Sequence, residues 1–155
     1  RVGGLEKAEV TGEVSHDPMN HQIMVETRQA KVDKVAEFIP DLEVIGEEEG
    51  DVLVVGWGGT FGALVSAVND MQQEGKSLSL AQFNYLNPLP KNTAEVFSRF
   101  NKILVCELNL GQMASYLRSK HPQFTYLQYN KIQGLPFFIS ELKEKFREVL
   151  SENNA

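Results

Sequence analysis

Residues 51–151 alternate between short apolar runs and longer stretches in which apolar residues recur at helical spacing. Runs that are apolar throughout are typical of strands buried on both faces of a sheet, and two occur here, at residues 52–55 and 103–106. Residues 78–83 and 126–129 are predicted as two further strands. After the first run, Leu64, Val65, Val68 and Met71 share one face of a predicted helix. The order of strand and helix, repeated four times, predicts a mostly parallel sheet with helices on both faces.

Polar residues in front of the helical stretches have the character of helix caps. The predicted N-caps are Thr60, Asn92, Asn109 and Ser140. Glu95 and Gln112 follow two of these caps by three residues, which is the spacing of a capping box. Gly75 ends the first of these helices.

The first 40 residues have a different pattern. Residues 1–16 are polar, rich in glycine and valine, and lack helical periodicity, so we expect an arm or hairpin. Asp17 followed by Pro18 is typical of a helix start, and the sparse, one-sided apolar residues after it predict a long helix to about Phe38. We predict two parts: an N-terminal arm with a long linking helix over 1–40, and an α/β domain over 41–155.

Composition and charge restrict the classes of protein and of partner that fit this chain. The chain has 155 residues, of which 42% are hydrophobic and 23% charged, as in a globular domain. The net charge of −6 comes from one acidic turn at residues 41–51. The remaining charges balance and form no basic stripe, which argues against a nucleic-acid partner. No apolar run approaches the ~20 residues that cross a membrane. Because Arg1 stands first, we expect a piece of a longer protein.

The glycine-rich stretch at residues 54–62 reads VVGWGGTFG. A dinucleotide fingerprint needs a third glycine where this chain has Phe61, and an acid about 20 residues further on, which residues 75–94 lack. No Gly-Lys-Ser/Thr follows, so a P-loop is also excluded. We favour a tight structural turn. The alternative is a small anion- or nucleotide-binding module that uses the loop from Gly56 to Thr60.

Polar residues with glycine or proline mark the ends of the other strands, where open α/β sheets place their sites. Helix capping and turn chemistry could explain several of them alone. An acid that closes a buried strand needs a partner, so we expect Glu107 to pair across an interface. The candidate interface or anion contacts are Gly58, Gly59, Thr60, Asn87, Glu107, Asn109, Gln112, Asn130 and Lys131.

Residues that could support catalysis or metal binding are few. The three histidines, His16, His21 and His121, are scattered and lack partners at ligand spacing. Cys106 lies in a predicted buried strand, where cysteine is usually an inert hydrophobe. We therefore predict no catalytic residue, no cofactor-binding residue and no metal ligand in this chain.

Six segments in order resemble the C-terminal part of the alpha subunit of 2-oxoacid:ferredoxin oxidoreductases, most closely the 2-oxoglutarate type. They are RVGGLEKAE at 1–9, HDPMNHQIMVETRQAKV at 16–32, LVVGWGGTFG at 53–62, LNPLP at 86–90, ILVCELNLGQM at 103–113 and YNKIQGLPF at 129–137. The chain departs from the family pattern at Gly3 and Gly4, where a TG-type pair is usual, and at Gly59, where serine is frequent.

The resemblance implies a transketolase C-terminal-like domain, a three-layer α/β/α fold with a five-stranded, mostly parallel sheet. The one antiparallel strand would be residues 42–45. It also implies a parent enzyme that oxidatively decarboxylates 2-oxoglutarate with coenzyme A to succinyl-CoA and passes electrons to ferredoxin. Thiamine diphosphate, Mg and iron-sulfur clusters would lie in other domains.

In this interpretation the chain is a non-catalytic structural and assembly domain of a cytoplasmic enzyme. Its partners would be the remaining domains of the alpha subunit and the beta subunit, with ferredoxin and coenzyme A reached through the complex and a homodimer possible. The isolated chain would be inactive.

Overall fold

The computed structural model describes residues 3–151, so the first two residues of the predicted arm and the last four of the chain lie outside the described part. Five strands form one sheet: β1 (Val44–Ile45), β2 (Gly50–Trp57), β3 (Leu78–Phe83), β4 (Phe100–Glu107) and β5 (Tyr126–Asn130). Their spatial order is β1-β3-β2-β4-β5. β1 runs antiparallel to β3 and the other pairs are parallel, so the predicted sheet is confirmed.

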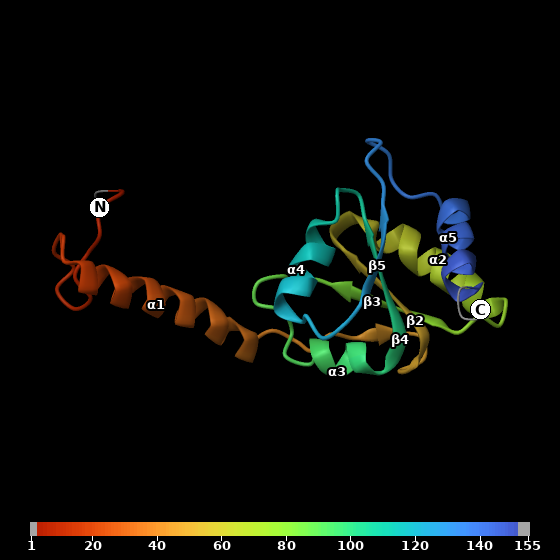
Figure 1. Cartoon of the computed structure of the whole chain (residues 1–155), viewed down its shortest axis with the longest axis horizontal. Coiled ribbons are helices and arrows are strands. Elements are labelled where there is room, and N and C mark those ends of the chain that lie inside the picture. Colours follow the sequence, from red (N-terminus) through yellow and green to blue (C-terminus); the bar gives the residue numbers. More distant parts are fainter. Residues whose placement is uncertain (1–2, 152–155) are drawn as a thin grey trace.

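Helices cover both faces of the sheet (Figure 1). The helices of one face are α2 (Phe61–Gln73) and α5 (Ile139–Ser151), and those of the other are α3 (Thr93–Ser98) and α4 (Gln112–Lys120). Successive residues of β2 point to opposite faces, so Val54 packs in the core beneath α2 and α5 while Val55 packs beneath α3 and α4. Two cores therefore flank the sheet, which explains why its central strands are continuously apolar.

Three predicted helix caps are wrong. Ser140 lies inside α5, which begins at Ile139. Thr60 and Asn92 stand at helix starts but make other side-chain contacts. The Thr60 hydroxyl turns back, donating to Trp57 O at 2.8 Å and accepting from Trp57 N at 3.3 Å, because a short 3₁₀ turn, Gly58–Thr60, precedes α2. The Asn92 side chain bonds both backbone groups of Leu42, at 2.8 and 3.0 Å, and so ties α3 to the segment that enters β1. Gly75, with φ +76°, follows the end of α2 as predicted.

The N-terminal part forms a hairpin, with Lys7 bridged to Val14, and then helix α1 (Pro18–Lys34). Asp17 caps α1 as predicted by accepting from Met19 N at 2.9 Å, and a 3₁₀ turn, Val35–Glu37, continues the helix. Figure 1 shows α1 extending away from the sheet and its helices. None of the residues of α1 is buried.

Candidate functional site at the carboxyl end of the sheet

The order of the strands creates a crevice at one edge of the sheet. The chain leaves β2 toward β3 on one side and leaves β4 toward β5 on the other, although β2 and β4 are neighbours. In open α/β sheets, ligands and partners are bound outside the carboxyl ends of the strands at such a switch point. We call this side of the molecule the carboxyl-end edge. It comprises the loops that follow β2, β3, β4 and β5.

A cavity of about 270 Å³ lies at the switch point itself, between the loop after β2 and the loop after β4. Its lining includes five residues that the sequence singled out: Gly58, Gly59, Thr60, Asn109 and Gln112. These residues are about 50 positions apart along the chain, and the parallel pairing of β2 with β4 brings them together.

A second cavity, of about 290 Å³, shares Trp57 and Gln112 with the first. It also contains the predicted residue Asn87, whose side-chain oxygen accepts a hydrogen bond from the Tyr116 hydroxyl at 3.3 Å. Trp57 and Gln112 therefore border both hollows. Trp57 was not among the candidate residues predicted from the sequence. Its position, an aromatic residue between the end of a strand and a glycine-rich turn, could have indicated it.

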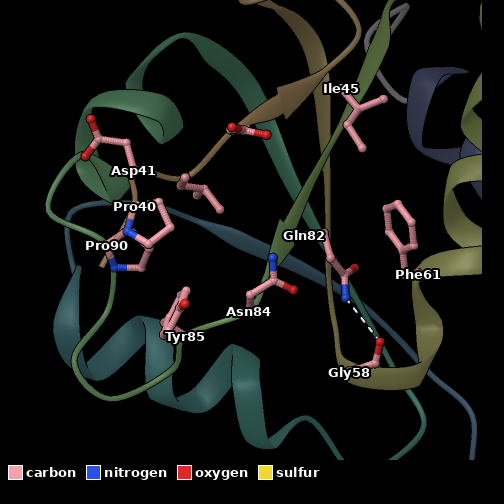
Figure 2. A pocket seen from close by; sticks show the side chains of 11 residues that line it. Pro40, Asp41, Ile45, Gly58, Phe61, Gln82, Asn84, Tyr85 and Pro90 are labelled. Carbon is pink, nitrogen blue, oxygen red and sulfur yellow. Dashed lines mark hydrogen bonds between the residues drawn. The ribbon is translucent and has the colours of Figure 1, made fainter. Parts of the chain in front are cut away.

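The largest of these three cavities, about 470 Å³, lies beyond Gly58 on the β3 side and is shown in Figure 2. Gln82 reaches across from β3 and donates a hydrogen bond to Gly58 O at 3.2 Å. Figure 2 shows the Asn84 amide and the Tyr85 ring on one side of this cavity and the Phe61 ring on the other. Residues 40–43 close the far side, a contact that local sequence patterns do not contain.

Glu107 departs from the prediction of a partner across an interface. It is completely buried, and its carboxylate accepts hydrogen bonds from Met113 N at 2.7 Å and Ala114 N at 3.0 Å, with the Trp57 indole N–H at 3.4 Å. Its negative charge lies at the positive end of the α4 dipole, an arrangement that stabilises both. Within the chain, Glu107 therefore anchors the start of α4 and orients Trp57.

The other donors at the start of α4 are also paired internally. The Asn109 side-chain oxygen accepts from Gly111 N at 2.8 Å and from Gln112 N at 2.9 Å. Asn109 therefore caps α4 with its side chain, but from two positions before the N-cap residue, Gly111, and not from the predicted N-cap position. No side-chain bond from Gln112 back to the cap is present among the described residues. Because Glu107 already supplies a carboxylate, this helix end disfavours a second anion.

Lys131 is also an internal residue. Its ammonium contacts Pro136 O at 2.8 Å and the Glu141 carboxylate at 2.6 Å, and only 5% of the residue is exposed. Partial burial acts to raise the pKa of Glu141, but the Lys131 ammonium and the Phe138 N–H outweigh it and hold that pKa below its ordinary value. Lys131 thus secures the loop after β5, while its neighbour Asn130 is exposed at the strand end.

The glycines of the loop after β2 are explained by packing. A Cβ at Gly56 would lie 2.3 Å from Leu64 Cδ1 and 2.7 Å from Gln82 Oε1, so glycine allows α2 to approach the strand. Gly58 has φ +58°, a conformation that favours glycine. These contacts support the structural turn and weaken the nucleotide-binding alternative.

Apolar side chains are exposed at the carboxyl-end edge and not at the opposite one. From residue 41 onward, the large hydrophobic residues that are exposed are Phe61, Tyr85, Leu108, Leu110, Ile132, Leu135, Phe138 and Ile139. All of them lie in loops that follow parallel strands, or at the first position of the helix after such a loop. The loops at the opposite edge, at 46–49, 74–77, 98–99 and 121–125, contain none of these exposed residues.

Charged residues are more frequent in the loops of the opposite edge than in those of the carboxyl-end edge. The loops of the carboxyl-end edge, at 58–60, 84–92, 108–111 and 131–138, contain two charged residues, Lys91 and the internally paired Lys131. The loops of the opposite edge contain six such residues, including the three consecutive acids of 47–49. A surface that is rich in exposed apolar side chains and poor in charge, beside several hollows, is typical of a region that another protein surface covers.

Features that would indicate other chemistry are lacking in the part of the chain that the structure describes. Among residues 3–151, no three His, Cys, Asp or Glu side chains cluster so as to hold a metal ion. Burial raises the pKa of the Cys106 thiol far above its ordinary value, which disfavours the reactive thiolate. No helix in this region is both long and apolar enough to cross a membrane.

Comparisons with known proteins give consistent relatives, although no protein-family model matches the chain. The chain is 39% identical over 153 residues to the 2-oxoglutarate oxidoreductase subunit KorA of Mycobacterium tuberculosis, covering 97% of this chain and 23% of that protein. It is 29% identical to subunit alpha of 2-oxoacid:ferredoxin oxidoreductase 1 of Aeropyrum pernix, covering 90% of this chain and 23% of that one. The chain thus spans about a quarter of the length of these relatives.

Two solved structures share the fold. The 2-oxoglutarate:ferredoxin oxidoreductase of Magnetococcus marinus, solved with 2-oxoglutarate, coenzyme A and succinyl-CoA, matches 95% of this chain at a TM-score of 0.86 and 30% identity, over 26% of its own chain. The alpha chain of a probable 2-oxoacid ferredoxin oxidoreductase from Thermoplasma acidophilum matches 72% of this chain and 97% of its own, at a TM-score of 0.51 and 25% identity.

Proposed function

This chain belongs to the family of alpha subunits of 2-oxoacid:ferredoxin oxidoreductases, and on that premise we propose that it is a non-catalytic assembly domain whose carboxyl-end edge docks onto the rest of the enzyme. The observation that supports this most strongly is the gathering of all eight exposed large hydrophobic residues of 41–151 at that edge. Single exposed hydrophobic residues are ordinary, but their concentration at one edge of the sheet, beside hollows, favours an interaction surface.

Eight of the nine candidate residues have one of two roles in this proposal, and the ninth, Asn130, is exposed at the end of β5. Gly58, Gly59, Asn87, Asn109 and Gln112 line the hollows at the edge and would contact the partner. Thr60, Glu107 and Lys131 are buried and would shape the surface from beneath. The polar groups that remain exposed are mainly amides, which can pair with a partner backbone at little desolvation cost compared with charges.

We further propose the division of the chain at residue 40. The absence of buried residues in α1 supports a linking helix outside the α/β body. The Thermoplasma acidophilum alpha chain supports the same division, because 97% of that chain matches only 72% of this one.

For the complete enzyme we propose the 2-oxoglutarate reaction, with coenzyme A as acyl acceptor, succinyl-CoA as product and ferredoxin as electron acceptor. The names of the 39% identical relative and of the Magnetococcus marinus structure support this substrate. Thiamine diphosphate, Mg and iron-sulfur clusters would be held by other domains and by a beta subunit. We propose a cytoplasmic complex in which the alpha subunit could pair with a second copy.

The test places a charge at the proposed docking surface of the complete alpha subunit. Leu110 is 82% exposed, so Leu110→Asp leaves both cores intact while adding a desolvation penalty to any interface at this edge. We expect the variant subunit to fold but to lose assembly by light scattering, together with 2-oxoglutarate-dependent reduction of ferredoxin. Gln123→Asp adds the same charge at the opposite edge and should assemble normally. Normal assembly and activity of Leu110→Asp would refute the proposal.

A further inference from the structure

Strand β5 is the last strand on one side of the sheet and pairs with β4 alone, so the outer side of its backbone has no neighbouring strand. In a parallel pair, the N–H and C=O groups of alternate residues point toward the neighbouring strand and away from it. Lys131 N donates to Glu107 O at 2.9 Å, so the odd-numbered residues of this segment face β4. The backbone groups of Gln128 and Asn130 therefore point away from the sheet.

The first part of this outer side is occupied from within the chain, and the second part is not. Tyr126 O accepts a hydrogen bond from Arg118 Nη2 at 3.0 Å, so a charged side chain covers the start of the strand. Within residues 3–151, no hydrogen bond joins the backbone N–H or C=O of Gln128 or Asn130 to another residue. Unpaired backbone groups in a row along an edge strand are the groups to which an added strand binds.

The two edges of the sheet differ in how open they are to such pairing. β1 has two residues, with Glu43 before it and the three acids of 47–49 after it, and short strands and charges both block pairing at an edge. β5 has five residues, 126–130, and none of them is charged. In Figure 1, α4 and α5 lie on either side of β5, where they cover the two faces of the sheet. The edge at β5 is therefore the open one.

The free backbone groups adjoin the carboxyl-end edge. Gly111, in the loop after β4, lies directly against the Gln128 side chain and leaves no room for a Cβ. Leu110, which is 82% exposed, precedes it in the same loop. Asn130 is exposed at the end of β5. A partner that covers this edge must therefore satisfy the backbone groups of Gln128 and Asn130, because burying them without hydrogen bonds costs free energy.

We propose that an extended segment of the rest of the enzyme adds to the outer side of β5 as a short strand, with its backbone paired to Gln128 and Asn130. An extended segment fits because its own N–H and C=O groups are free, whereas those of a helix are bonded within the helix. The Arg118 guanidinium limits the added strand to the second half of β5. Because it states how the partner binds beside the carboxyl-end edge, this inference rests on the proposed function.

Hydrogen exchange resolved to single amides tests the inference without any mutation. In the 155-residue chain, Gln128 and Asn130 should exchange rapidly, whereas Tyr129 and Lys131, which face β4, should exchange slowly. In the complete enzyme, Gln128 and Asn130 should exchange at least about 100-fold more slowly than in the chain. Rapid exchange of both in the complete enzyme would overturn the inference. Slow exchange of both in the chain alone would also overturn it, since the added strand would then be absent or would come from a second copy.

A matched pair of variants in the complete enzyme separates backbone pairing from contact with the side chain. Gln128→Pro removes an N–H that faces away from β4 and so breaks no hydrogen bond of the sheet, whereas Gln128→Ala keeps that N–H. Urea denaturation of the two variant chains checks that both fold. Asn130 should exchange rapidly again in Gln128→Pro and stay protected in Gln128→Ala, and equal exchange in the two variants would overturn the inference.

The variant Leu110→Asp distinguishes failure of this inference from failure of the proposed function. If Leu110→Asp abolishes assembly while Gln128→Pro leaves Asn130 protected, the added strand is refuted and the docking of the carboxyl-end edge stands. If Leu110→Asp assembles normally, the proposed docking fails, and the added strand fails with it as a part of that interface.

Discussion

Glutamine in place of Glu107 removes a buried negative charge that three N–H groups share. The carboxylate accepts from Met113 N, Ala114 N and the Trp57 indole, whereas an amide offers one oxygen and places its own N–H₂ group against these donors. Hydrogen bonds to a charged acceptor contribute about 1.5–3 kcal/mol each, and a buried donor left without a partner costs about 1–3 kcal/mol. Loss of the charge at the α4 dipole adds about 0.3–1 kcal/mol.

These contributions predict that Glu107→Gln lowers the free energy of unfolding by about 2–4 kcal/mol, since one oxygen still accepts. Glu107→Ala, which also leaves a cavity, should lower it by about 3–5 kcal/mol. Urea denaturation followed by circular dichroism and by the fluorescence of Trp57, the only tryptophan, measures both. For a chain of this size, 3 kcal/mol corresponds to a fall in Tm of about 6–12 °C.

Glu49→Gln is the matched control, because it removes the same charge from an exposed position at the opposite edge of the sheet. Its effect should stay within about 0.5 kcal/mol. A second, local measurement is amide exchange at Met113 and Ala114, which should become faster in Glu107→Gln than in the control. If Glu107→Gln unfolds within about 0.5 kcal/mol of the unaltered chain, the carboxylate does not hold α4, and the reasoning fails.

Three further changes test other contacts. Gly56→Ala should lower the free energy of unfolding by about 1–3 kcal/mol, because the added methyl group overpacks the contact with α2. In the control Gly59→Ala the methyl group meets open space, so the free energy of unfolding should change by less than about 0.5 kcal/mol. Equal effects of the two changes in urea denaturation would contradict the packing explanation. Asn92→Ala breaks both bonds to the segment before β1 and should cost about 1–3 kcal/mol in the same assay; an unchanged midpoint would show that those bonds contribute nothing. The contacts of Glu6 with Arg28 and then His21 lower its pKa to about 2, so its support of the hairpin is complete above its ordinary pKa and is lost as the pH falls toward 2. A carboxyl NMR titration should give this low midpoint, and Arg28→Ala should raise it; a midpoint near 4.5 in the unaltered chain would contradict the contact.

The sheet could be predicted from the sequence because its determinants are local. Continuous apolar runs identify β2 and β4, and helical spacing between them identifies α2 and α4, so the parallel order follows from chain connectivity. The antiparallel direction of β1 came from the family resemblance, since a strand of two residues carries almost no pattern of its own.

The side-chain contacts were predicted less well because they depend on distant partners. Asn92 has the spacing of a helix cap. The backbone N–H and C=O of Leu42, 50 residues away in the sequence, bind the Asn92 side-chain amide in place of the helix N–H groups. Glu107 was correctly expected to have partners, but a sequence does not show that the next helix turns its first N–H groups back onto the strand end. The cavity between residues 40–43 and β3 has the same origin, because it exists only once β1 pairs with β3.

The buried polar groups explain why the carboxyl-end edge suits a protein partner better than a phosphate. An apolar interface requires that charges and helix ends beneath it be neutralised beforehand, since a buried group without a partner costs free energy. Glu107 and Asn109 satisfy the first donors of α4, and Glu141 neutralises Lys131, all from within the chain. Leu108 and Leu110 can then be exposed beside polar groups that are already satisfied within the chain. A phosphate site would instead leave those helix N–H groups free, so the same carboxylate that anchors α4 also directs the edge toward assembly.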